Sequence, residues 1–166
     1  ISKEFQVINL INDYRKRGHL FTKTNPVRER REYKPKLDIE NFGLQSQDLD
    51  VVFEAGREVG LGPSKLSDII NHLNLVYCQS IGVEYMYIRD QNEINWIKNF
   101  IHKNNNHAIF DTLKKKKILK ELNDAVMFEN FLARKYVGQK RFSLEGAESL
   151  IPSLHHGIEE GMKLGV

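Results

Sequence analysis

The sequence predicts a mainly α protein, with a helical N-terminal domain that has little or no strand and a last helix that opens a further element. Apolar residues recur at helical spacing in several long stretches, whereas few segments alternate as a strand does. Hydrophobic residues are 40% and charged residues 28% of the 166, the balance of a globular chain rather than a disordered one. This length suits one domain, or one small domain and the start of another.

The first helix is predicted from Ser2, which is a favourable N-cap. Its apolar stripe is Val7, Leu10, Ile11 and Tyr14. We expect Gly18 to end this helix in a left-handed conformation. Residues 19–45 contain prolines and a dense group of charges, which predicts a long charged loop.

The middle of the chain holds two clear helices. After a short helix following Ser46 and a brief extended segment at 51–53, a helix is predicted over residues 66–77, with Ser64 available as its cap. Residues 81–88 are rich in β-favouring side chains, which predicts a strand-like linker. Asp90 and Glu93 form a capping-box pattern for the next helix, and residues 104–106, all asparagine, end it.

Two helical regions complete the chain. The first begins at Asp111 and carries two apolar stripes, which a bend near residues 123–124 would reconcile. The second begins about one turn before Pro152 and has one apolar face. That face consists of Ala147, Leu150, Ile151, Leu154 and Ile158. Because this element opens so close to Val166, we expect the chain to be part of a longer polypeptide.

Charge and cysteine content argue against several functions. The net charge is +3, with segment balances of +4, −3 and +2 over residues 1–40, 41–110 and 111–166, so nucleic-acid binding is not favoured. The four lysines at 114–117 fan around a helix and are more typical of a solvated surface. Cys78 is the one cysteine, which excludes an internal disulfide and indicates a reducing compartment. No apolar run approaches the roughly 20 residues that span a bilayer.

Candidate chemical groups are few. His155 and His156 invite a metal interpretation, but adjacent helical residues diverge by about 100°, so a metal site is not favoured. Four acids are candidate general acids or bases, but no nucleophile or phosphate-binding pattern accompanies them, so they are predicted to be surface or capping residues. These acids are Glu84, Glu129, Glu145 and Glu148. Residues 140–146 precede a helix start and suit the edge of an anionic-ligand site; an ordinary linker with Ser143 as cap is an equal alternative.

Three segments, residues 13–19, 77–88 and 135–152, closely resemble the E1 component of 2-oxoglutarate dehydrogenase, in order and at matching spacing. The resemblance runs from about residue 5 to residue 158. It implies an oxidoreductase of the citric acid cycle that uses thiamine diphosphate and Mg²⁺ to decarboxylate 2-oxoglutarate and to succinylate the lipoyl group of an E2 partner. It also implies a homodimer bound to E2 and E3, located in the cytoplasm of a bacterium, which is favoured, or in the mitochondrial matrix of a eukaryote.

The resemblance also implies a domain division and a site. Residues 1–137 would be the helical N-terminal domain, and residues 138–166 would begin a truncated α/β thiamine-diphosphate-binding domain. The family's His-Arg-Gly-Arg and Gly-Asp-Gly motifs do not occur here, so no catalytic, cofactor-binding or metal-binding residue is assigned and the isolated chain is expected to be inactive without bound cofactor. Four residues are expected at the edge of the active site. They are Arg141, Phe142, Ser143 and Glu145.

Three alternatives stay open at this point. The chain is a self-contained helical interaction module if the apolar face of its last helix is covered internally. It is a nucleic-acid binder if residues 114–117 give steeply salt-dependent affinity. The resemblance does not separate 2-oxoglutarate from 2-oxoadipate as the substrate.

Overall fold

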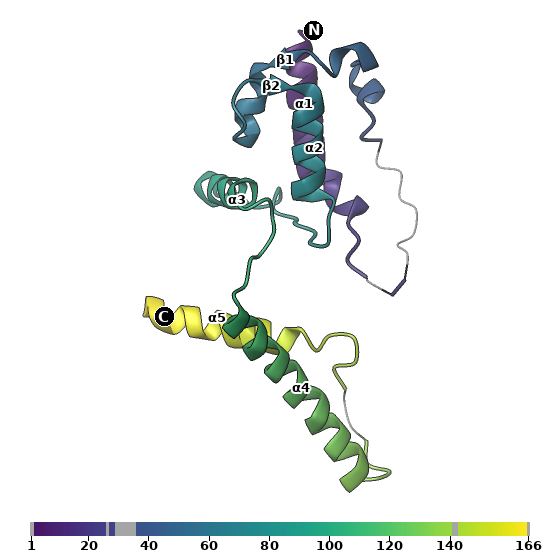
Figure 1. Cartoon of the computed structure of the whole chain (residues 1–166), viewed down its shortest axis with the longest axis vertical. Helices are drawn as coiled ribbons and strands as arrows, with labels where there is room; N and C mark the ends of the chain where they lie inside the picture. The colour runs from purple at the N-terminus through teal and green to yellow at the C-terminus, as the bar shows by residue number, and fades with distance from the viewer. Residues whose placement is uncertain (1, 26, 29–35, 141–142, 166) are drawn as a thin grey trace. The chain divides into compact units, whose positions relative to one another are not determined.

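The computed structural model describes residues 2–25, 27–28, 36–140 and 143–165 (Figure 1). The chain forms two compact units, Ile1–Ala108 and Ile109–Val166. Helices dominate both units, and the strands of the described residues form one two-stranded antiparallel sheet, so the predicted mainly α class is confirmed. The domain boundary expected at 137/138 falls inside the second unit and stays a prediction.

The first unit combines three α-helices with short 3-10 turns and a small hairpin. Its elements, in chain order, are α1 (Lys3–Arg17), η1 (Gly18–Phe21), η2 (Ile39–Phe42), η3 (Ser46–Asp48), β1 (Val52–Phe53), η4 (Glu54–Val59), β2 (Ser64–Lys65), α2 (Leu66–Tyr77) and α3 (Gln91–Lys103). The two strands pair with Val52 opposite Lys65 and Phe53 opposite Ser64. In Figure 1, α1 and α2 lie side by side, and they contact each other directly.

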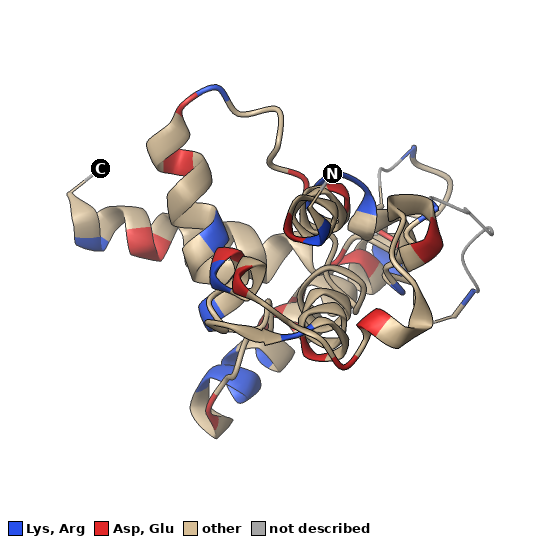
Figure 2. Cartoon of the chain, turned by 90° about the horizontal axis from the view of Figure 1, so that it is seen from above, with Lys and Arg blue, Asp and Glu red and all other residues tan. Residues whose placement is uncertain are grey.

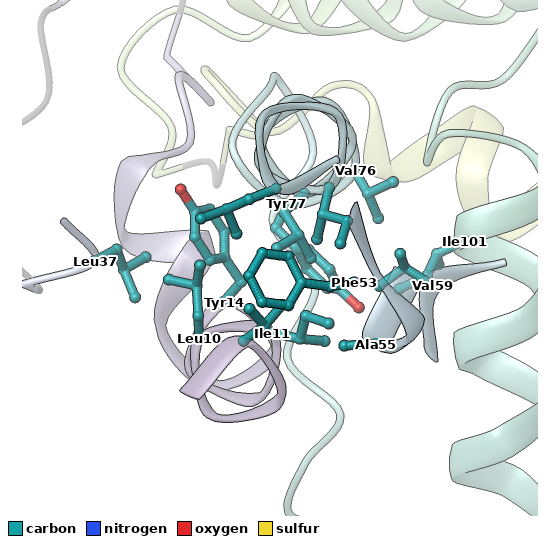
Figure 3. Packing of buried hydrophobic residues seen from close by; sticks show 14 of the residues in the cluster. Leu10, Ile11, Tyr14, Leu37, Phe53, Ala55, Val59, Val76, Tyr77 and Ile101 are labelled. Carbon is teal, nitrogen blue, oxygen red and sulfur yellow. The ribbon is translucent and has the colours of Figure 1, made fainter. Parts of the chain in front are cut away.

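The core of this unit lies between α1, α2 and η4. The Phe53 ring sits among Leu10 and Ile11 of α1 and Val59 of η4, and all four are buried (Figure 3). Hydrogen bonds also hold α1 against η4: the Glu4 carboxylate accepts from the backbone N–H groups of Glu54 and Ala55, both at 3.0 Å. The predicted apolar stripe of α1 is therefore the face that builds the core.

Within the charged loop expected at 19–45, the described part is not wholly irregular. It contains the 3-10 turns η1 and η2, and Leu37 and Leu44 are buried against the core. These two leucines thus attach the C-terminal half of the segment to the core.

The second unit is a pair of helices, α4 (Thr112–Lys135) and α5 (Leu150–Leu164), which contact each other. Asp111 caps α4, as predicted from the sequence, through a hydrogen bond from the Lys114 N–H to its carboxylate. No residue of α4 is buried, and Pro152 is the buried residue of α5. Within its unit, the predicted apolar face of α5 is exposed, with Leu154 at 55% and Ile158 at 62% of their full accessibility. This unit therefore has very little apolar core of its own.

Four local predictions need correction. Gly18 is right-handed (φ −58°), because the chain continues from α1 into η1 instead of stopping there. Ser64 belongs to β2 and its hydroxyl donates to the Gly62 carbonyl, so Lys65 occupies the N-cap position of α2. Residues 81–88 form a linker without a strand. Helix α4 runs without interruption through residues 123–124, where a bend was expected.

Two predicted helix caps are confirmed. The Ser2 and Asp90 side chains accept backbone hydrogen bonds at the starts of α1 and α3. Asn105 and Asn106 adopt positive φ angles just after α3, which is how the chain leaves that helix. Across the described residues, no helix combines the length and the apolar character needed to cross a bilayer.

Gly18 is needed because there is no room for a side chain at this position, not because of its backbone conformation. This predicts the effect of Gly18→Ala. A Cβ atom at this position would lie 2.7 Å from the Tyr77 Cβ, so α1 and α2 would have to move apart. We expect the free energy of unfolding to fall by about 1–3 kcal/mol, measured by urea denaturation. Gly82→Ala is the matched control, because its Cβ meets its nearest neighbour at an ordinary 3.4 Å. Equal stabilities of the two variants would contradict the packing argument.

Candidate functional site

The strip of residues 143–146 leads from α4 into α5 and contains two of the four residues expected at an active-site edge. Ser143 and Glu145 are described; Arg141 and Phe142 lie outside the described residues. The Glu129 carboxylate of α4 accepts hydrogen bonds from two adjacent residues of the strip. The Ser143 hydroxyl donates to one of its oxygens at 2.9 Å, and the Leu144 N–H donates to the other at 2.7 Å.

A tight turn follows this contact. The Glu145 N–H donates to the Ser143 hydroxyl oxygen at 3.1 Å, and the Gly146 N–H donates to the Glu148 carboxylate at 3.0 Å. Gly146 has φ +84°, a conformation that side-chain-bearing residues rarely adopt. Two acids of this region are therefore engaged by backbone or hydroxyl donors, while the Glu145 side chain is exposed.

Charged and polar side chains link α4 to α5. The Lys117 ammonium pairs with the Glu159 carboxylate, and His155 Nδ1 lies 2.6 Å from a Glu121 oxygen. Lys114 contacts His156 Nδ1 at 2.9 Å. Figure 2 shows both basic and acidic residues on these helices. The lysine run thus contributes two of its members to contacts with α5 rather than presenting four charges on one surface.

The other sequence candidates are not gathered into one site. Glu84 belongs to the first unit, where its carboxylate is 67% exposed and lies 3.5 Å from His19 Nε2. His155 and His156 each face a different carboxylate of α5, Glu159 and Glu160. In the part of the chain that the structure describes, no three His, Cys, Asp or Glu side chains come together as a metal-binding group.

A hollow of about 360 Å³ lies along the C-terminal half of α4. Its described lining consists of Met127, Asn130, Phe131, Arg134 and Lys135. These residues repeat at helical spacing on one face of α4, so the hollow has an apolar floor and a cationic end.

A buried polar cluster in the first unit was not found from the sequence. The Tyr77 hydroxyl of α2 contacts the Tyr85 hydroxyl at 2.9 Å and His102 Nε2 of α3 at 3.0 Å. His102 Nδ1 in turn contacts His72 Nε2 at 3.0 Å, with the two rings stacked. The guanidinium of Arg15, which is 3% exposed, adjoins both tyrosines and donates to the Glu58 carbonyl at 2.7 Å.

One choice of tautomers satisfies all the hydrogen bonds of this cluster. The Val59 backbone also hydrogen-bonds to His72, and in this arrangement His72 Nε2 accepts from His102 Nδ1–H. A neutral His102 then accepts at Nε2 from the Tyr77 hydroxyl, which accepts from Tyr85. Each member has one donor and one acceptor role, so the cluster is satisfied when both histidines are neutral.

Electrostatics favour this neutral state. Burial is the main cause that lowers the pKa of His102 to about 3, and the adjoining His72, Arg15 and Lys98 act in the same direction because a second positive charge near them is unfavourable. Burial also lowers the pKa of His72 and raises the pKa values of Tyr77 and Tyr85. The sequence signal for this cluster was weak, because Tyr77 and His102 lie on separate helices.

The one thiol of the chain is unreactive by the same physics. Cys78 follows α2, and its sulfur contacts the Gly18 carbonyl at 3.6 Å. Burial raises its pKa to about 11, so little thiolate exists near neutral pH.

Comparison with known proteins finds that the chain is similar to part of several enzymes whose names refer to 2-oxoglutarate. It is 41% identical, over 99% of its length, to a multifunctional 2-oxoglutarate metabolism enzyme of Mycolicibacterium vanbaalenii. It is 38% identical over its full length to a 2-oxoglutarate dehydrogenase E1/E2 component of Corynebacterium glutamicum, and 36% identical over 91% of its length to a 2-oxoglutarate dehydrogenase E1 component of Coxiella burnetii. No protein-family model matches the chain.

These similarities confirm the resemblance to the 2-oxoglutarate dehydrogenase E1 component that the sequence motifs indicated. The relatives are dehydrogenases or multifunctional enzymes by name. The chain spans 13%, 14% and 17% of the lengths of these three relatives, so it corresponds to a small part of each.

The buried histidines predict a pH dependence of stability. Between pH 6.5 and about 3, an unfolded His102 binds a proton that the folded chain does not. The contribution of His102 to the free energy of unfolding is therefore fully present above pH 6.5. It falls as the pH drops below this value, by up to about 1.4 kcal/mol per pH unit. His72 acts in the same direction. Urea denaturation of the chain between pH 7 and 4.5 measures this slope.

Two variants separate His102 from other titrating groups. His102→Gln is expected to reduce the slope, whatever its effect on stability at pH 7. His107→Gln removes an exposed histidine of the same unit and should leave the slope unchanged. A slope that is identical in the wild type and in His102→Gln would contradict the assignment.

Proposed function

We propose that this chain is an N-terminal part of the E1 component of a 2-oxoglutarate dehydrogenase complex, which decarboxylates 2-oxoglutarate and transfers the succinyl group to lipoyl-E2. The observation that carries the proposal is similarity over 91–100% of the chain to three proteins whose names contain 2-oxoglutarate, two of them E1 components. On this proposal the enzyme is a homodimer of the cytoplasm that associates with E2 and E3.

The second unit supports a role inside a larger protein. Phe128 and Phe131 of α4 are 61% and 55% exposed, and Leu154 and Ile158 of α5 are exposed as well. A module complete in itself would cover such side chains, because burial of apolar surface is the main stabilising term of folding. A self-contained interaction module is the second candidate, and it requires that these side chains be covered within the chain itself.

The proposed enzyme requires thiamine diphosphate and Mg²⁺, and the proposal assigns their ligands to other parts of the longer polypeptide. The described carboxylates and histidines form no metal-binding group, and the acids nearest the strip are occupied by protein donors. Residues of the strip contribute to the edge of the active site, with Glu145 as the described side chain most available to a ligand.

The isolated chain is therefore expected to be inactive and to bind the cofactor negligibly. Isothermal titration of residues 1–166 with thiamine diphosphate, with and without Mg²⁺, should give no measurable heat beyond dilution. The full-length enzyme, titrated in the same way, is the positive control. Micromolar, Mg²⁺-dependent binding to residues 1–166 would contradict the proposed division of roles.

An active-site-edge role predicts that substitutions in the strip act on turnover. In the full-length enzyme, Arg141→Ala and Glu145→Ala should each lower kcat for 2-oxoglutarate by about tenfold, the loss expected for one interaction with a charged group, with little change in Tm. Glu160→Ala is the matched control, since this half-exposed acid pairs with Lys163 within α5. Parallel losses of turnover and Tm would indicate structural damage instead.

A further inference from the structure

Glu129 differs from its neighbours on α4. Its side chain is half-buried, whereas Phe128 and Asn130 beside it are exposed. Burial of a carboxylate is costly unless its oxygens are hydrogen-bonded. Here each oxygen has its own donor, the hydroxyl of Ser143 at 2.9 Å and the backbone N–H of Leu144 at 2.7 Å. The burial is therefore explained by the contact with the strip.

The same contact joins the strip to the helix. Among the described residues, the other hydrogen bonds of positions 143–146 stay within positions 143–148. Local bonds of this kind shape a turn but do not fix its place relative to α4. The two bonds to Glu129 do so, because they come from adjacent residues and end on one rigid carboxylate.

The Ser143 hydroxyl is used both as a donor and as an acceptor. Its hydroxyl proton is donated to Glu129 and its oxygen accepts from the Glu145 N–H at 3.1 Å. One hydroxyl thus links the carboxylate of α4 to the backbone of Glu145, so the position of Glu129 sets the point from which the Glu145 side chain projects.

We infer that Glu129 is a positioning residue, whose carboxylate holds Ser143 and Leu144 against α4 and so places Glu145 at the edge of the active site. This inference rests on the proposed function, because the active site belongs to the full-length enzyme. It assigns Glu129 no contact with substrate; its effect passes through the strip.

The first test measures the contact itself in the 166-residue chain. Glu129→Ala removes the acceptor of the Leu144 N–H, and amide hydrogen exchange followed by NMR should show Leu144 exchanging about tenfold faster or more. Glu121→Ala is the matched control, because Glu121 lies on the same helix and pairs with His155 of α5. It should leave Leu144 unchanged. Equal exchange of Leu144 in the wild type and Glu129→Ala would overturn the inference.

The second test measures turnover of 2-oxoglutarate by the full-length enzyme. Glu129→Ala should lower kcat about tenfold, leave the KM for thiamine diphosphate within about twofold, and change Tm no more than Glu121→Ala does. Glu129→Gln should restore most of the activity, because its amide oxygen accepts from the Leu144 N–H and its amide nitrogen donates to the Ser143 oxygen.

The outcomes separate the two proposals. A wild-type enzyme that does not turn over 2-oxoglutarate overturns the proposed function, and the positioning role with it, while Leu144 exchange still reports the contact. An active wild type whose kcat is unaffected by Glu129→Ala overturns the positioning role alone. A Glu129→Gln variant as impaired as Glu129→Ala also overturns it, since the hydrogen-bonding geometry would then not be what matters.

Discussion

The first unit depends on the burial of Tyr77. The absence of a side chain at Gly18 lets the end of α1 approach the Tyr77 Cβ, and this approach sets the spacing of α1 and α2. The hydroxyl at the other end of the ring is then enclosed, and a buried hydroxyl must be hydrogen-bonded. Tyr85 of the linker and His102 of α3 supply the partners. One side chain thereby connects α1, α2, the linker and α3, and the low pKa of His102 is a consequence of the same enclosure.

The second unit is built on a different principle. Its two helices are joined by ion pairs and hydrogen bonds at half-exposed side chains, such as Lys117 with Glu159, and contacts of this kind are screened by solvent and contribute little to stability. Most of its large apolar side chains remain exposed within the unit. Helix formation is therefore supported by local features, namely the Asp111 cap and the position of Pro152 in the first turn of α5, rather than by a core of its own.

Periodicity and caps predicted what depends on local sequence. The stripe from Val7 to Tyr14 and the caps Ser2, Asp90 and Asp111 are local, and the structure has them. The conformation of Gly18 was predicted wrongly because its reason is Tyr77, 59 positions later in the chain. The buried cluster was missed for the same cause, since His72 and His102 meet through the packing of α2 and α3. Glu129 was recognised as a candidate acid, but its role depends on a strip that begins 14 residues later.

The acids around the strip show how structure separates residues that the sequence treats alike. Glu129 and Glu148 both accept backbone N–H donors, at Leu144 and Gly146, and are therefore occupied in shaping and holding the turn. Glu145 lies between these two donors and has an exposed side chain, with no hydrogen bond to it among the described residues. A carboxylate that is held in place by its backbone yet left unengaged is suited to meet a ligand cation or a donor group from elsewhere in a larger protein. Glu145 is thus singled out because Glu129 and Glu148 are engaged in hydrogen bonds that shape the turn, whereas its own carboxylate is exposed.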